Sequence, residues 1–225
     1  MLTPPPHSTE TMKVLIADDH AIVRRGLRQI LAEEFSRLEV GEARNAQEAL
    51  RLARERDWEI IVLDISMPGR SGVEVLKELK QVCPKTPVLI LTGHPEEQYA
   101  IRVLRAGAAG YMNKETAPDH LIAAVRKVIG GGRYISPALA ELLVVSLGGD
   151  PARMPHEDLS DREYQVLCMI ASGKTVGGIA GELALSVKTI STHKTRILEK
   201  MEFSNPAELV RYAVEHGLVD EGGAV

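Results

Sequence analysis

Five short apolar runs, separated by longer segments with apolar residues at helical spacing, constrain the fold of this chain more than any other feature. We predict that these runs are β-strands, at residues 13–17, 38–43, 59–63, 87–91 and 110–113. The segments between and after them are predicted helices, at about 20–34, 45–56, 71–82, 96–106 and 118–130. Such alternation is typical of a parallel sheet covered by helices. The predicted fold is therefore α/β, a flavodoxin-like five-stranded parallel sheet whose ligand crevice lies at the carboxyl ends of the first and third strands.

The alternation of strands and helices stops after residue 134. Residues 135–158 are predicted to be a linker, in which "PALAELLVVSL" is compatible with one helix and "GGDPARMPHED" is rich in Gly, Pro and charge. Residues 159–221 are predicted to form a small all-α domain, with helices at about 160–172, 176–183, 187–201 and 206–216. The expected organisation is therefore a disordered lead (1–11), an α/β domain (12–134), the linker and the helical domain.

Capping boxes are predicted at the start of one helix in each domain. Ser71 with Glu74, and Ser160 with Glu163, have the spacing that lets a serine and a glutamate side chain satisfy free backbone N–H groups reciprocally. Both pairs stand directly before an apolar periodic segment, so we expect both to fix the first turn of a helix.

Composition excludes several classes of protein. The chain has 225 residues, of which 44% are hydrophobic and 26% charged, enough for two soluble domains with their own cores. It has no run of eighteen apolar residues, and its first residues carry three prolines where a signal peptide would need an apolar core, so we expect a cytoplasmic protein with no membrane partner. Cys83 and Cys168 lie far apart without metal-binding spacing and are interpreted as core residues.

Acidic and polar side chains stand at the ends of the predicted strands. Asp18 and Asp19 follow the first strand and Asp64 follows the third, so the topology should bring three carboxylates into one crevice. A divalent cation relieves their mutual repulsion, and an all-oxygen site suits Mg²⁺. Thr92 and Lys114 stand at the ends of the next two strands, where each could contact a phosphoryl group built on Asp64 as nucleophile. Each residue alone has a structural explanation, since an Asp after a strand often caps a helix and a lone Lys is usually a solvated charge. Five such residues at four strand ends indicate a reactive site.

Four motifs carry a resemblance to a known family: "IADDH", "LDISMPGRSG", "LTGH" and "GYMNK". In this order they resemble the receiver domain of two-component response regulators, over about residues 12 to 130. The resemblance implies that Asp64 takes a phosphoryl group from a histidine kinase. It also implies that Asp19, Asp64 and the backbone carbonyl of Ser66 hold Mg²⁺, with Asp18 completing the acidic pocket.

The same resemblance assigns the parts of a switch. Lys114 would pair with the phosphoryl group, Thr92 would move to bond it, and Tyr111 matches the switch aromatic whose rotamer follows that threonine. Ser66 and His94, two residues beyond Asp64 and Thr92, would flank the route of an attacking water and tune the lifetime of the acyl phosphate.

The predicted helix over residues 187–201 has two contrasting faces. Its apolar face carries Ile190, Ile197 and Met201, and the opposite face carries Lys188 and Thr192 among other polar residues. A helix that packs on one side and presents such residues on the other can enter a DNA major groove. The alternative, a merely solvated polar face, stands equally well for this helix considered alone.

"LSDREYQVL", "ASGKT", "IAGEL", "LSVKTISTH" and "RILEKM" resemble the LuxR-type helix-turn-helix, and the whole chain resembles the NarL/FixJ class of response regulators. The resemblance implies base-edge contacts from Lys188 and Thr192, and phosphate contacts from Thr189, Lys194 and Arg196. It also implies a homodimer on phosphorylation that binds inverted repeats at promoters, with RNA polymerase as a further candidate partner.

One departure from the LuxR-type pattern concerns the helix before the DNA-contacting one. Val176, Gly177 and Gly178 stand where the family commonly has a polar residue and a glutamate, so the capping-box partner of Thr175 is missing. Two glycines inside a helix cost about 1 kcal/mol each relative to alanine. We therefore expect this helix to be locally weak.

The expected function is that of a DNA-binding response regulator, in which phosphorylation of Asp64 controls dimerisation and transcription-factor activity. We expect the first domain to cover or misorient the DNA-contacting helix until phosphorylation releases it. Two alternatives belong to other classes. One is a phosphohydrolase with Asp64 as nucleophile. The sequence argues against it, because Ser66, two residues after Asp64, occupies the position where a carboxylate would be needed as general acid. The other is a regulator controlled by partners or ligands without phosphorylation.

Overall fold

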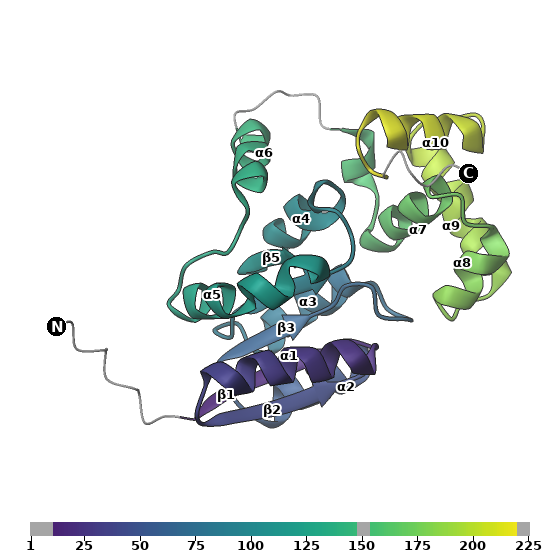
Figure 1. Cartoon of the computed structure of the whole chain (residues 1–225). Coiled ribbons are helices and arrows are strands. Elements are labelled where there is room, and N and C mark those ends of the chain that lie inside the picture. The colour runs from purple at the N-terminus through teal and green to yellow at the C-terminus, as the bar shows by residue number, and fades with distance from the viewer. Residues whose placement is uncertain (1–10, 148–153, 220–225) are drawn as a thin grey trace.

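The structure, a computed structural model, describes residues 11–147 and 154–219 (Figure 1). Nearly all of the expected disordered lead, the middle of the predicted linker and the last residues of the predicted helical domain lie outside the described residues.

The first domain contains the predicted sheet. Its strands are β1 (Met12–Ala17), β2 (Leu38–Ala43), β3 (Ile60–Leu63), β4 (Val88–Thr92) and β5 (Gly110–Asn113). All pair in parallel, in the order β2-β1-β3-β4-β5. The flavodoxin-like five-stranded sheet is thereby confirmed, and the strand order reverses between β1 and β3, where such folds place their ligand crevice.

Helices cover both faces of the sheet (Figure 1). They are α1 (Ala21–Glu34), α2 (Ala46–Glu55), α3 (Gly72–Val82), α4 (Glu96–Arg105) and α5 (Ala117–Ile129). One core lies between the sheet and α1 with α5, and the other between the sheet and α2, α3 and α4. Alternate residues of β3 serve each core: Ile61 and Leu63 face one, and Ile60 and Val62 the other. Burial on both faces explains why the strands are continuous apolar runs.

One of the two predicted capping boxes is wrong. Ser71 occupies the N-cap of α3 but makes no side-chain cap hydrogen bond, and it is buried. The helix start is fixed instead by tertiary packing, because a Cβ added to Gly72 would lie 2.3 Å from the Cα of Ile65. Ser160 and Glu163 do form the predicted capping box at the second domain's first helix.

The second part of the chain is helical. It contains α6 (Pro137–Leu147), a 3₁₀ turn η2 (Pro155–Asp158), α7 (Asp161–Ala171), α8 (Val176–Glu182), α9 (Val187–Lys200) and α10 (Pro206–Glu215). The four predicted helices of the small domain and the helix in the linker are confirmed, whereas η2 was not predicted. Ile179, Ile190, Ile197 and Leu209 are fully buried in its core. None of the described helices is long and apolar enough to cross a bilayer.

The start of α8 keeps its cap although the glutamate is missing. The side chain of Thr175 accepts a hydrogen bond from the backbone N–H of Gly178, at 3.1 Å. Gly177 is exposed. A Cβ added to it would have no atom of the described residues within 4 Å. Neither observation requires a glycine at position 177. Among the described residues, no contact at this position offsets the expected weakness of α8.

Candidate functional site

Three carboxylates lie together at the carboxyl end of the sheet. Asp18 and Asp19 follow β1 and Asp64 follows β3, and these strands are neighbours. Asp18 is 2% exposed and Asp64 1%, whereas the Asp19 side chain is 28% exposed. Ligand atoms of all three and of His20 lie within 4.8 Å of one another, so the cluster could hold a metal ion.

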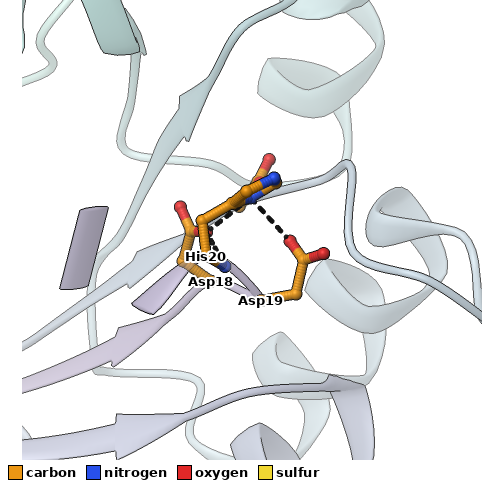
Figure 2. Close-up of side chains that lie close together, drawn as sticks. Asp18, Asp19 and His20 are labelled. Atoms are coloured by element: carbon orange, nitrogen blue, oxygen red, sulfur yellow. Dashed lines mark hydrogen bonds and ion pairs between the residues drawn. The ribbon is translucent and has the colours of Figure 1, made fainter. Parts of the chain in front are cut away.

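His20 belongs to this cluster although the sequence did not point to it. Figure 2 shows its ring lying over the two neighbouring carboxylates. Its Nδ1 lies 3.2 Å from Asp18 Oδ1 and 3.0 Å from Asp19 Oδ1, and its backbone N–H donates to Asp18 Oδ1 at 2.8 Å. The only available signal was its position directly after the two aspartates.

Lys114 links two of the buried carboxylates. Its Nζ lies 2.6 Å from Asp64 Oδ2 and 2.8 Å from Asp18 Oδ2. Burial lowers the pKa of Lys114, but the hydrogen bonds and charges of Asp18 and Asp64 outweigh burial and leave the pKa above its usual value. The lysine is therefore a permanent positive charge beside Asp64.

The acidic cluster has unused capacity for a cation. Among the described residues, neither Asp18 Oδ2 nor Asp19 Oδ1 accepts a hydrogen bond of good geometry, although both atoms are buried. Both oxygens nevertheless lie at ion-pair distance from a neighbour, Asp18 Oδ2 from Lys114 Nζ at 2.8 Å and Asp19 Oδ1 from His20 Nδ1 at 3.0 Å. Three carboxylates gathered beside one lysine leave an excess of negative charge, which suits an oxygen-liganded divalent cation.

Ser66 contacts the other carboxylate oxygen of Asp64, and Thr92 contacts Ser66. The Ser66 N–H donates to Asp64 Oδ1 at 2.8 Å, and the hydroxyls of Ser66 and Thr92 are 3.1 Å apart. Thr92 is fully buried at the end of β4, and its Oγ1 accepts from the backbone N–H of His94 at 3.4 Å. The structure thus connects Asp64 to the loop between β4 and α4 through two hydroxyls.

Tyr111, on β5, reaches the same loop. It is fully buried, and its hydroxyl donates to the carbonyl oxygens of His94 and Pro95, at 2.8 and 3.2 Å. His94 itself is half-buried, and burial lowers its pKa, although the charge of Asp64 partly opposes this. Tyr111 therefore holds the chain at the point where α4 begins.

The predicted DNA-contacting residues gather on α9. Lys188, Thr192 and Arg196 are exposed, and Thr189 and Lys194 are partly buried. We expected the first domain to cover or misorient this helix, and the structure does not show covering, since these three side chains are exposed. The two domains meet through α7 instead.

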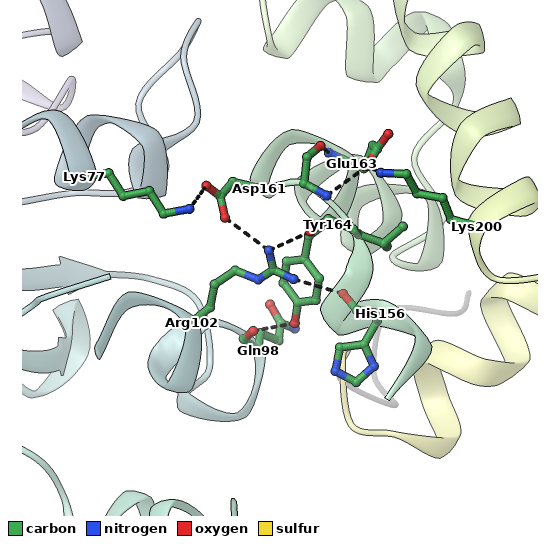
Figure 3. A network of polar contacts seen from close by, with 10 residues as sticks. Lys77, Gln98, Arg102, His156, Asp161, Glu163, Tyr164 and Lys200 are labelled. Carbon is green, nitrogen blue, oxygen red and sulfur yellow. Dashed lines mark hydrogen bonds and ion pairs between the residues drawn. The ribbon is translucent and has the colours of Figure 1, made fainter. Parts of the chain in front are cut away.

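Arg102, on α4, is the centre of that contact (Figure 3). Its guanidinium donates to the carbonyl oxygens of Leu159 and His156, both at 3.0 Å, and to Asp161 Oδ1 at 3.1 Å. It also lies over the ring of Tyr164, 4.2 Å from the centroid, in a cation–π arrangement. One arginine of the first domain thus binds the start of α7 and the turn before it.

Further contacts surround this arginine (Figure 3). Lys77, on α3, pairs with Asp161 Oδ2 at 2.6 Å, and the Tyr164 hydroxyl donates to the backbone carbonyl of Gln98. The Tyr99 and Tyr164 rings meet edge to face at 5.4 Å. Sequence reasoning missed this network, because its members lie far apart in the chain and a lone Arg or Lys on a helix looks like a solvated charge.

Comparison with known proteins identifies both domains. Residues 14–126 match the family model of the response regulator receiver domain, and residues 157–213 match that of bacterial regulatory proteins of the LuxR family. Response regulator GacA of Pseudomonas aeruginosa is 38% identical over 210 residues, which cover 93% of this chain and 98% of GacA. Response regulator UvrY of Escherichia coli K12 is 34% identical over 208 residues, covering 92% and 95%. The chain is a response regulator of the NarL/FixJ class.

Solved structures of response regulators agree with this membership. RcsB of Salmonella enterica serovar Typhimurium, bound to promoter P1flhDC in the presence of the phosphomimetic BeF₃⁻, is 30% identical with a TM-score of 0.62, covering 92% of this chain and all of the RcsB chain. This response regulator therefore combines a receiver with a LuxR-type DNA-binding domain. Its family comprises DNA-binding transcription regulators, which sets aside the phosphohydrolase alternative.

Proposed function

We propose that Asp64 is the phosphoacceptor of this response regulator, charged by a histidine kinase, and that its phosphorylation controls dimerisation and promoter binding. The observation that carries the proposal is the contact of Lys114 Nζ with Asp64 Oδ2 at 2.6 Å, at the buried end of β3. A buried carboxylate held beside a permanent cation and at the rim of an acidic cluster is placed to accept a phosphoryl group and to have its new charge neutralised.

Mg²⁺, which the receiver family typically binds, fits the acidic cluster. Asp19, Asp64 and the backbone carbonyl of Ser66 would hold it, with Asp18 beside them, and three carboxylates beside one lysine carry an excess negative charge that such a cation would neutralise. When bound, Mg²⁺ neutralises charge on the carboxylates and on phosphoryl oxygens.

In the proposed transfer step, Asp64 is the nucleophile. A carboxylate oxygen of Asp64 attacks the phosphorus of the kinase's phosphohistidine, the P–N bond breaks, and the imidazole leaves with that electron pair. Lys114 then pairs with a phosphoryl oxygen instead of the free carboxylate. Thr92 gives up its contact with Ser66 and donates to the phosphoryl group, and Tyr111 follows it. Ser66 and His94 flank the approach of the water that later hydrolyses the acyl phosphate.

The signal reaches the second domain through α4. Tyr111 fixes the carbonyls of His94 and Pro95 at the start of this helix, and Arg102 two turns later holds α7. Movement of Thr92 and Tyr111 therefore displaces the helix that restrains the DNA-binding domain. We infer that the receiver restrains the domain's position, rather than covering α9.

The released domain would bind promoter DNA as a dimer. In this proposal Lys188 and Thr192 contact base edges, and Thr189, Lys194 and Arg196 contact phosphates. The exposure of Lys188, Thr192 and Arg196 supports it. One related structure is described as two RcsB dimers bound to two parallel DNAs. Because a symmetric dimer reads a symmetric site, each promoter would carry an inverted repeat. RNA polymerase would be a further partner at the promoter. The regulator would act in the cytoplasm.

Phosphorylation can be tested with acetyl phosphate and Phos-tag electrophoresis of the full-length protein. The wild type should shift with Mg²⁺ present and lose the shift when EDTA is added, whereas Asp64→Asn should not shift. Asp57→Asn, an exposed aspartate before β3, is the matched control and should behave as the wild type. A shift in Asp64→Asn, or none in the wild type, would favour the alternative of a regulator that works without phosphorylation.

A further inference from the structure

We propose that α9 recognises thymine through methyl groups, supplied by Val187 and by its threonines, so that each DNA half-site carries thymines opposite the start of this helix. The proposal rests on the proposed function, in which α9 enters the major groove. It goes beyond that function by naming the chemical group on DNA that is recognised and the residues that recognise it.

Val187 is the first observation. It is the first residue of α9 and is 55% exposed, whereas Ile190 and Ile197 on the same helix are fully buried. The N-terminal residues of a recognition helix are the ones that contact base edges. An exposed isopropyl group at this position offers a base edge an apolar contact and nothing else.

The hydroxyl bonds of two threonines are the second observation. Thr192 Oγ1 donates to the carbonyl oxygen of Lys188 at 3.0 Å, and Thr195 Oγ1 donates to that of Ser191 at 3.1 Å. Both threonines are exposed, yet the hydroxyl proton of each is used within the helix. The hydroxyls therefore have no proton left for an acceptor on a base, although each can still accept a hydrogen bond. The methyl group is the other group that each exposed threonine offers to DNA.

Methyl groups on α9 select one base. In the major groove thymine alone presents a methyl group, on C5, and apolar side chains and threonine methyls contact it. Removing one buried methyl contact weakens binding about fourfold, from the usual cost of one buried CH₂ group. In a symmetric dimer the same loss occurs in both half-sites, which gives about sixteenfold.

Lys188 and Arg196 complete the surface without competing for this role. Both are exposed on the outward side of α9 and can contact guanine or phosphate, as cations do. They supply affinity, whereas the methyl groups would distinguish thymine from the other bases. The two kinds of contact can therefore be separated experimentally.

The test uses full-length protein treated with acetyl phosphate and a random duplex library. Sites selected from the library are resynthesised with deoxyuridine in place of single thymidines, which removes only the 5-methyl group. For the wild type we expect about fourfold weaker binding for each such replacement opposite α9.

Matched variants assign the effect to side chains. Thr192→Val keeps the methyl shape and removes the hydroxyl, so it should bind as the wild type and remain sensitive to deoxyuridine. Thr192→Ser and Val187→Ala change both half-sites of the dimer, so each should bind thymidine sites at least about sixteenfold more weakly. Each should also lose sensitivity to deoxyuridine at one position of every half-site. Val214→Ala, at an exposed valine of α10, is the control and should change nothing.

Two results would overturn the proposal while leaving the DNA-binding role of α9 intact. One is equal affinity of the wild type for thymidine and deoxyuridine duplexes. The other is wild-type binding by Thr192→Ser together with loss of binding by Thr192→Val, which would assign the contact to the hydroxyl. If Lys188→Ala and Arg196→Ala also leave binding unchanged, the assignment of α9 as the DNA-contacting helix fails, and this proposal fails with it.

Discussion

Replacing Arg102 with alanine should free the DNA-binding domain from the receiver without phosphorylation. The Arg102 side chain is only 19% exposed and donates to the carbonyls of Leu159 and His156. Leaving these two acceptors unpaired costs about 1 kcal/mol each, and losing the contact with the Tyr164 ring costs about 1 kcal/mol more. Asp161 remains paired with Lys77, so the loss of its contact with Arg102 leaves no unpaired carboxylate and adds no further cost.

The sum is about 3 kcal/mol of docking free energy, which shifts the equilibrium between docked and undocked domains about 150-fold. Small-angle X-ray scattering of the unphosphorylated protein should therefore show a larger radius of gyration for Arg102→Ala. The same variant should bind promoter DNA more nearly as the phosphorylated wild type does, because its domain is no longer restrained.

Arg105→Ala is the matched control on the same helix. Arg105 pairs with Glu157 at 3.1 Å, but its side chain is 54% exposed, and exposed ion pairs contribute about 0 to 1 kcal/mol. Its scattering should match that of the wild type. Identical scattering and DNA affinity for the Arg102 and Arg105 variants would refute the role given to Arg102.

Two further predictions concern stability. Gly177→Ala should stabilise the DNA-binding domain by about 1 kcal/mol, since a Cβ there meets no described atom, and a lower melting temperature would show that the glycine is needed. His156 should make stability pH-dependent: burial, then the charge of Arg102, lowers its pKa to about 4, from 6.5. As the pH falls, His156 therefore takes up a proton in the unfolded chain before it does so in the folded one. Its contribution to the free energy of unfolding is fully present above pH 6.5 and is lost as the pH drops towards 4. Urea titrations at several pH values should show a shallower fall for His156→Gln, and equal slopes would contradict this.

The sheet could be predicted because burial on both faces leaves a continuous apolar signal in each strand. The position of Asp64 beside Asp18 followed from the same topology, since parallel strands end at one edge. Thr92 could be identified in the same way, because it stands at the end of the fourth predicted strand. Tyr111 was found only through the family resemblance, because nothing in its local sequence distinguishes it from an ordinary strand residue.

Contacts between distant segments could not be predicted. Arg102 lies on a helix where its charge looks solvated, and its partners at Leu159 and Asp161 are separated from it by 57 and 59 positions. The capping box at Ser71 failed for a related reason, since the loop packing around Gly72 outweighs a local side-chain pattern. The sequence left open whether the receiver covers or misorients α9, because the motifs identify the two domains and not their orientation.

Genome-wide mapping of DNA occupancy, in cells that carry either the wild type or Asp64→Ala, tests most directly the claim that Asp64 controls promoter binding. The account predicts that wild-type sites share an inverted repeat and that occupancy at these sites falls in the Asp64→Ala strain at equal protein level. Equal occupancy at the same sites in both strains would contradict it.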